Sequence, residues 1–130
     1  MRVYLCRHAR AAAGEPDELR PLTAEGERDA RRLGERLATA AEPPTIVLTS
    51  PLLRARQTAE AIALAAGVEL RVEPALAPGL TAESLVETVA PYGAAVAAVG
   101  HQPDCSEIAV ALSGRDPGFP PAGMAELDLS

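Results

Sequence analysis

The chain has 130 residues and only two histidines, and each histidine follows closely on a short apolar segment. His8 comes after residues 2–6, and His101 comes after residues 94–99. A neutral imidazole is a good nucleophile near pH 7, because the unperturbed pKa of histidine is about 6.5. Attack of His8 on phosphorus would form a phosphohistidine and split a difficult hydrolysis into two easier steps. His101 would donate a hydrogen bond to the same phosphate group. For His8 alone, a structural hydrogen bond is the simpler interpretation, and His101 could equally cap the helix that follows it.

Arginine supplies every positive side chain that could hold such a phosphate. All 12 basic residues are arginines, and a planar guanidinium stays charged and grips two phosphate oxygens at once. Arg7 directly precedes His8, and Arg54 falls in the first turn of a predicted helix, where free N–H groups also favour anions. We expect Arg7 and Arg54 to clamp the phosphate, although any single arginine among so many is more simply a surface residue. Candidate hydrogen-bond donors around the clamp are Ser50, Gln57 and Thr58.

A metal site is an alternative for the same part of the sequence. A zinc set can be drawn from Cys6, His8, His101 and Cys105. The spacings Cys-x-His and His-x₃-Cys are not those of the usual zinc motifs. Cys6 also falls inside a predicted strand, where packing is the commoner role of a cysteine. We therefore predict no metal ligands and no cofactor.

Five short strand-like segments alternate with four helix-like segments. Short runs of β-branched and apolar residues predict strands, and apolar residues spaced three or four apart predict helices. Thr23 and Thr81 are typical helix N-caps, Gly67 is a typical C-cap, and Pro51 is expected in the first turn of its helix. The predicted strands are residues 2–6, 45–49, 68–72, 94–99 and 124–129, and the predicted helices are residues 24–42, 50–66, 82–90 and 103–112.

This alternation predicts the α/β fold class, with a mostly parallel sheet and helices on both faces. Ligands of open α/β sheets bind beyond the carboxyl ends of the strands. His8, Arg54 and His101 all follow such ends, so we expect them to meet at one edge of the sheet. No repeat or linker interrupts the pattern, which predicts one domain over residues 1–130.

The composition excludes several classes of protein. The formal net charge is −6 and aromatic residues make up 2 %, so the chain lacks the basic face and the stacking surfaces of a general nucleic-acid binder. No run approaches the ~20 apolar residues of a membrane span, and no signal peptide is visible before Arg7. The two cysteines are expected to be free thiols. We expect a cytoplasmic protein that binds neither nucleic acid nor membrane, with no indication of its oligomeric state.

Four motifs, in this order along the chain, resemble the histidine phosphatase superfamily, which is phosphoglycerate mutase-like. They are Arg7-His8-Ala9, residues 20–26 (RPLTAEG), residues 50–59 (SPLLRARQTA) and residues 100–103 (GHQP). Within that superfamily the chain looks most like the short SixA-type phosphohistidine phosphatases. The resemblance implies a three-layer α/β/α sandwich and removal of phosphate without a metal. It also implies the catalytic set His8 (the phosphorylated nucleophile), Arg7, Arg54 and His101, with Arg20 and Ser50 expected to bind substrate.

Two positions depart from the superfamily pattern. Ala9 replaces a glycine that often follows the Arg-His pair, as it does in short SixA-like members. Pro78 falls where many members carry a glutamate as proton donor, and Glu73 and Glu83 are near only in sequence. A missing general acid costs about 10²–10⁴ in rate when the leaving group needs a proton. Imidazole leaving from phosphohistidine suffers least, because the P–N bond is weak and the nitrogen is easily protonated.

The preferred function is therefore a phosphatase acting on phosphohistidine, with a phosphorylated protein as partner. The short chain leaves little sequence for a lid, so we expect a pocket open enough for a protein-borne phosphate. Three alternatives stay open: a phosphomonoesterase for a small phosphate substrate on the same site, a non-catalytic phosphate-binding module, and a metal-dependent enzyme.

Overall fold

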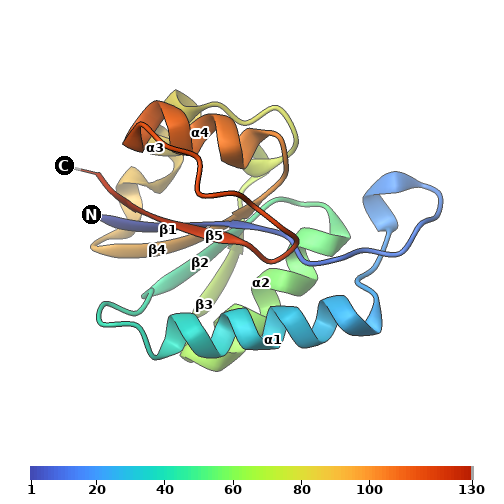
Figure 1. Ribbon diagram of the computed structural model, residues 1–130. Helices are drawn as coiled ribbons and strands as arrows, with labels where there is room; N and C mark the ends of the chain where they lie inside the picture. Colours follow the sequence, from blue (N-terminus) through green and yellow to red (C-terminus); the bar gives the residue numbers. More distant parts are fainter. Residues whose placement is uncertain (130) are drawn as a thin grey trace.

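The computed structural model describes residues 1–129 and orders their strands and helices as the sequence predicts (Figure 1). The strands are β1 (Arg2–Arg7), β2 (Ile46–Thr49), β3 (Glu69–Val72), β4 (Ala95–Gly100) and β5 (Met124–Asp128). The helices are α1 (Ala24–Ala38), α2 (Leu53–Ala66), α3 (Ala82–Val89) and α4 (Asp104–Ser113). Short 3₁₀ turns are η1 (Asp17–Leu19), η2 (Pro74–Leu76) and η3 (Ala90–Tyr92). Ser130, the last residue of the predicted domain, lies outside the described residues.

The strands form one sheet in the order β3-β2-β4-β1-β5. The first four of these run parallel, and β5 pairs antiparallel with β1 at the edge. Helices α1 and α2 cover one face of the sheet, while α3 and α4 cover the other (Figure 1). The predicted α/β/α sandwich with a mostly parallel sheet is therefore confirmed.

Burial follows from this layering. A parallel strand covered on both faces must be apolar along its whole length, and all six residues of β4 are buried. The two core clusters, one on each side of the sheet, consist mainly of alanine, valine, leucine and isoleucine. All residues of β2 and β4 are buried, as are the four inner residues of β1. The chain directly after these neighbouring strands therefore leaves the sheet beside the core.

The predicted caps are confirmed at Thr23, Thr81 and Gly67. Thr23 Oγ1 accepts from the backbone N–H of Gly26 at 3.0 Å, and Thr81 Oγ1 accepts from Ser84 at 3.2 Å. Gly67 ends α2 with a left-handed φ of 68°, a conformation that glycine adopts without steric cost.

Two local predictions were wrong, and a third was confirmed only in part. Pro51 is not in the first turn of α2, because residues 50–52 form a turn in which Ser50 Oγ accepts from the N–H of Leu52. Helix α1 ends at Ala38, where Thr39 bonds back to the carbonyl of Glu35. Strand β3 lies at the edge of the sheet, as its alternation indicates, and Val68 and Leu70 are partly buried. Only Val72 departs from the predicted alternation, because it is exposed. No helix within residues 1–129 combines the length and the apolarity needed to cross a membrane.

Candidate active site

The register between β1 and β4 brings the two histidines together. Arg7 is paired with Gly100, the last residues of these parallel strands, so the next residue of each strand lies at the same edge. The N–H of His8 donates to the carbonyl of Gly100 at 3.2 Å. The imidazole rings of His8 and His101 have centroids 5.2 Å apart and are tilted by 57°.

The tautomer of His8 is determined by one short hydrogen bond. Its Nδ1 lies 2.7 Å from the carbonyl oxygen of Ala9, and because a carbonyl can only accept, Nδ1 carries the proton. The lone pair is therefore on Nε2. Burial lowers the pKa of His8, and the charges of Arg54 and Arg7 lower it further against the opposing hydrogen bond to Ala9. His8 is thus neutral near pH 7, which is the nucleophilic form.

His101 is buried and is held by Ser50. Its Nε2 lies 2.7 Å from Ser50 Oγ, and only 4 % of the residue is exposed. Burial lowers the pKa of His101 to about 4, and His8 and Arg54 contribute in the same direction. His101 is therefore also neutral near pH 7, and an arriving phosphate anion would favour its protonation.

The two predicted clamp arginines both carry an unused donor. Arg7 Nη1 donates to the carbonyl of Phe119 at 2.9 Å, and Arg54 Nη1 donates to the carbonyl of Asp17 at 2.9 Å. Among the described residues, the Nε–H groups of Arg7 and Arg54 are buried and have no hydrogen-bond partner. A buried unpaired N–H costs free energy, so this pair of donors beside two neutral imidazoles has the chemistry of an oxyanion site.

Asp17 joins this site and was missed in the sequence. Its carboxylate bridges two arginines, with Oδ2 at 3.2 Å from Arg54 Nη2 and Oδ1 at 3.0 Å from Arg20 Nε. The hydrogen bond from Arg54, followed by the charges of both arginines, lowers the pKa of Asp17 against a smaller effect of burial. The signal was present: an acid three residues before Arg20, after Pro16, is the spacing at which side chains meet on a helical turn.

The loop after β1 is tied to α2 and α1 by contacts that fix its path. Thr58 Oγ1 accepts from the N–H of Ala9 and donates to the carbonyl of Arg54, and Gln57 Oε1 accepts from the N–H of Leu22. These two candidate donors therefore anchor the loop. A Cβ at Gly26 would lie 2.1 Å from the carbonyl oxygen of Arg10, so only glycine allows α1 to approach the loop this closely.

Neither glutamate near Pro78 hydrogen-bonds to the site residues. The carboxylate of Glu73 accepts from the hydroxyl of Tyr92, and Glu83 is exposed on α3. Pro78 itself lies exposed in the loop after η2. Among residues 1–129, the acidic side chain that touches the clamp is Asp17.

The two cysteines are buried on opposite sides of the sheet. Cys6 belongs to the cluster under α1 and α2, and Cys105 belongs to the cluster under α3 and α4. Both are free thiols, and burial raises the pKa of both, that of Cys105 to about 12. Within the described part of the chain, no three or more His, Cys, Asp or Glu residues gather as a metal-binding group.

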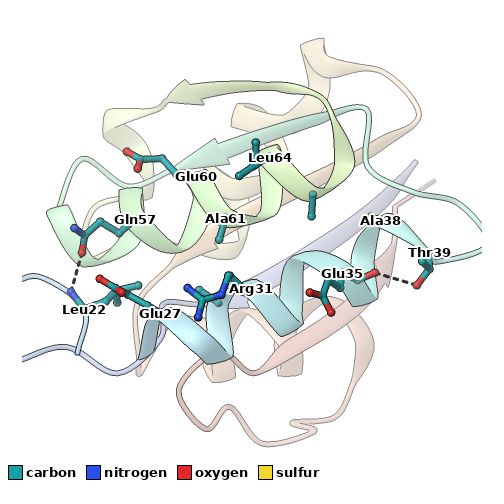
Figure 2. Close-up of a pocket in the computed structure, with 12 residues that line it drawn as sticks. Leu22, Glu27, Arg31, Glu35, Ala38, Thr39, Gln57, Glu60, Ala61 and Leu64 are labelled. Carbon is teal, nitrogen blue, oxygen red and sulfur yellow. Dashed lines mark hydrogen bonds between the residues drawn. The ribbon is translucent and has the colours of Figure 1, made fainter. Parts of the chain in front are cut away.

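A groove of about 690 Å³ lies elsewhere, between α1 and α2 (Figure 2). Alanines, Leu64 and three glutamates are among the residues that line it. At one end it includes Leu22 and Gln57, which touch the loop after β1. It holds neither histidine and neither clamp arginine, so it is separate from the candidate active site.

Sequence comparison identifies the family. The model of the histidine phosphatase superfamily (branch 1) matches residues 3–78, which is more than half of the chain. An uncharacterised protein of Picosynechococcus sp. is 40 % identical over 121 residues, which cover 87 % of this chain and 73 % of that protein. A Serratia proteamaculans protein named as a phosphoglycerate mutase, GpmB, is 38 % identical over 101 residues, which cover 70 % of this chain and 45 % of that protein. The chain thus spans less than half of the length of this second relative.

Solved structures agree with the family and specify the fold. An Agrobacterium tumefaciens protein named as a phosphohistidine phosphatase, SixA, is 31 % identical with a TM-score of 0.84, covering 98 % of this chain and 90 % of that chain. The protein histidine phosphatase SixA complexed with tungstate is 27 % identical with a TM-score of 0.87, covering 100 % and 89 %. The chain belongs to the histidine phosphatase superfamily, branch 1, and has the fold of the SixA proteins.

Proposed function

We propose that this chain removes phosphate from phosphohistidine on a protein, through a phosphohistidine intermediate on His8. The observation that carries the proposal is a neutral imidazole, with its lone pair on Nε2, in the field of two arginines whose buried Nε–H groups have no partner among the described residues. Family membership and the SixA-type fold support phosphatase activity in general. The protein substrate and the role of each residue belong to the proposal.

The proposed first step is attack of His8 Nε2 on phosphorus. Negative charge on a transferring phosphoryl group lies on its three equatorial oxygens, and fixed cations directed at those oxygens lower the barrier. Arg7 and Arg54 would supply these cations, and no metal is needed for that purpose. His101 would donate to the phosphoryl group while Ser50 holds its ring. Arg20 would extend the positive charge toward the mouth of the site.

The identity of the leaving group decides between substrate classes. An alkoxide leaving from a phosphate ester needs a proton, and its absence costs about 10²–10⁴ in rate. Glu73 is engaged by Tyr92, and the carboxylate beside the clamp, Asp17, has a lowered pKa and is ionised. A phosphohistidine ring that is already protonated leaves as neutral imidazole without this help, which supports phosphohistidine over a sugar phosphate.

Rapid-quench labelling tests the intermediate. With a phosphohistidine protein carrying radioactive phosphate, we expect acid-labile, base-stable label on His8 during turnover. His8→Ala should abolish both the label and the turnover while retaining the circular dichroism spectrum of the folded protein. Turnover by wild type without such label would contradict the nucleophilic role of His8.

A substrate panel tests the choice of leaving group. We expect a higher kcat/KM on phosphohistidine than on sugar phosphates and other alkyl esters. Preferred turnover of an alkyl ester would replace the proposal with a small-molecule phosphomonoesterase, and phosphate binding without any turnover would indicate a binding module.

We also propose a cytoplasmic location, which the two free thiols support because free thiols persist in reducing compartments. Cell fractionation, with detection of the protein in the cytoplasmic fraction, tests the location.

A further inference from the structure

We propose that Asp17 forms a subsite for the leaving imidazole, in which its carboxylate accepts the N–H of the ring nitrogen that is not bonded to phosphorus. The inference rests on the proposed function and deepens it, because it names the group that recognises the substrate side chain. Asp17 begins η1 in the segment between β1 and α1. Figure 1 shows this segment extending beyond the sheet at the end where β1 finishes.

The position of the carboxylate is set by the phosphate clamp itself. Asp17 Oδ2 lies 3.2 Å from Arg54 Nη2, and Oδ1 lies 3.0 Å from Arg20 Nε. The backbone carbonyl of Asp17 also accepts from Arg54 Nη1. Arg54 thus contacts Asp17 through both Nη atoms, and the proposal places the leaving group of a phosphate held by Arg54 next to this carboxylate.

The carboxylate can accept a further hydrogen bond. An ionised carboxylate offers about four lone-pair sites, and the two arginines occupy one on each oxygen. The side chain of Asp17 is 63 % exposed, whereas that of Arg54 is 8 % exposed. The free acceptor positions are thus open to a ligand, although the guanidinium beside them is buried.

The charges around Asp17 make it an acceptor and not a proton donor. Arg54 from α2 and Arg20 from the same loop lower its pKa, and His101 after β4 feels its negative charge. An ionised carboxylate cannot protonate an alkoxide leaving group. It can stabilise a cationic ring, and charge-assisted hydrogen bonds of this kind are roughly twice as strong as neutral ones.

Transfer from a protonated phosphoimidazole balances without any proton donor. His8 Nε2 bonds to phosphorus, the substrate P–N bond breaks, and the electron pair of that bond stays on the substrate ring. The ring leaves as neutral imidazole and keeps the N–H that it donates to Asp17. His8 is then the phosphoimidazolium, with its Nδ1–H on the carbonyl of Ala9.

The second step also balances. Water attacks phosphorus, the bond between phosphorus and His8 breaks, and its electron pair returns to Nε2. Both protons of the water leave with the phosphate as dihydrogen phosphate. The requirement of the cycle is therefore that the substrate ring stays protonated, and this is what an ionised carboxylate at the mouth favours. The subsite selects phosphoimidazoles over phosphate esters.

Two small substrates separate recognition of the leaving group from support of the clamp. Phosphoimidazole has the ring that Asp17 would bind, whereas p-nitrophenyl phosphate has a leaving group that needs neither a proton nor a carboxylate. We expect Asp17→Asn to lower the ratio of kcat/KM for phosphoimidazole to that for p-nitrophenyl phosphate by about 10- to 100-fold. Glu18→Gln, an exposed neighbour in the same turn, should leave the ratio unchanged.

The pH dependence of kcat provides a second measurement, because a purely structural role of Asp17 would leave that dependence unchanged. The alkaline limb of kcat reports ionisations in the enzyme–substrate complex. Without the carboxylate the bound ring loses its proton more easily, so Asp17→Asn should move this limb to lower pH with phosphoimidazole and leave it in place with p-nitrophenyl phosphate. Asp17→Ala, which retains the backbone carbonyl used by Arg54, repeats the test if the asparagine variant is unstable.

Equal losses on both substrates with an unmoved alkaline limb would show that Asp17 only supports Arg54. That result overturns the subsite and leaves the proposed function intact. A wild-type protein that hydrolyses p-nitrophenyl phosphate but not phosphoimidazole overturns the proposed function and the subsite together.

Discussion

At the scale of single residues, the site consists of two neutral imidazoles surrounded by positive charge. Burial and the nearby arginines lower the pKa of both His8 and His101. An arriving phosphate changes the sign of the local field, so His101 can become a cationic donor only once the anion is bound. His8 has its proton on Nδ1, bonded to the carbonyl of Ala9, so the lone pair on Nε2 is free while the ring is neutral. The proposed roles are therefore attack for His8 and donation for His101.

Arg54→Ala should lower kcat/KM strongly, because Arg54 is a buried cation with an unused donor. By analogy with loss of one oxyanion donor, we expect a cost of about 2–4 kcal/mol at the transition state, or about 30- to 1000-fold. Arg56→Ala is the matched control, because Arg56 lies on the same helix and its Nε bonds only to the carbonyl of Pro51 among described residues. Steady-state kinetics on phosphoimidazole measure both variants. Activity of Arg54→Ala close to that of the control would remove Arg54 from the clamp.

At the scale of elements, the strand register brings the candidate site residues together at one edge of the sheet. Arg7 and Gly100 are paired on adjacent strands, and Thr49 of β2 is paired with Val99. The residues that follow these positions, His8, His101 and Ser50, therefore leave three neighbouring strands at one edge. The parallel pairing of buried apolar strands is enough to place these three residues at the same edge of the sheet.

Gly26→Ala tests how the first helix supports the loop after β1. The added Cβ would meet the carbonyl oxygen of Arg10 at 2.1 Å, so either α1 or the loop must shift. We expect a loss of about 1–3 kcal/mol in the free energy of unfolding, as for other overpacked positions, together with reduced kcat, because Asp17 and Arg20 belong to that loop. Glu25→Ala, at an exposed neighbouring position, should change neither. Urea unfolding and kinetics on one preparation check both effects, and a fully active, equally stable Gly26→Ala protein would contradict the constraint.

Features that depend on local sequence could be predicted, whereas features that depend on distant parts of the chain could not. The apolar strands and the helix caps at Thr23 and Thr81 are local signals, and the mostly parallel sheet with helices on both faces followed from them. The strand order β3-β2-β4-β1-β5 was not predicted. The alternation of residues 68–72 indicated an edge-like strand, which the sheet confirms. The exposure of Val72 could not be predicted, because alternation alone does not show where the covering layer ends. Asp17 has a local sequence signal only in its spacing to Arg20. Its contact with Arg54, 37 residues away, depends on the folded loop and could not be predicted.

At the scale of the whole molecule, a local cluster of positive side chains lies within an acidic protein. The formal net charge is −6, while Arg7, Arg54 and Arg20 lie near His8 closely enough to lower its pKa. Long-range repulsion disfavours bulk polyanions, and the buried guanidinium groups favour a single well-positioned phosphate. This distribution of charge agrees with a substrate whose phosphate is carried on one exposed side chain.

The buried histidines also make folding stability depend on pH. The pKa of His101 is lowered to about 4 in the folded protein and is about 6.5 in an unfolded chain. Between these values the unfolded chain binds a proton that the folded chain does not, so the free energy of unfolding falls as the pH falls from 6.5 toward 4. The slope from one such group is at most about 1.4 kcal/mol per pH unit. Asp17, with its lowered pKa, contributes below this window.

Urea unfolding between pH 7 and pH 4.5 measures this slope, and His101→Gln should flatten it because the variant has no proton to gain at that position. The carboxylates and His8 titrate in both proteins, so their contributions cancel in the comparison. Added tungstate or phosphate should stabilise wild type more than the variant at pH 6, since the anion favours the protonated His101 and binds only the folded protein. The same slope in both proteins would mean that His101 is not held neutral by its surroundings, and the proposal that it turns cationic only with phosphate in place would fail with it.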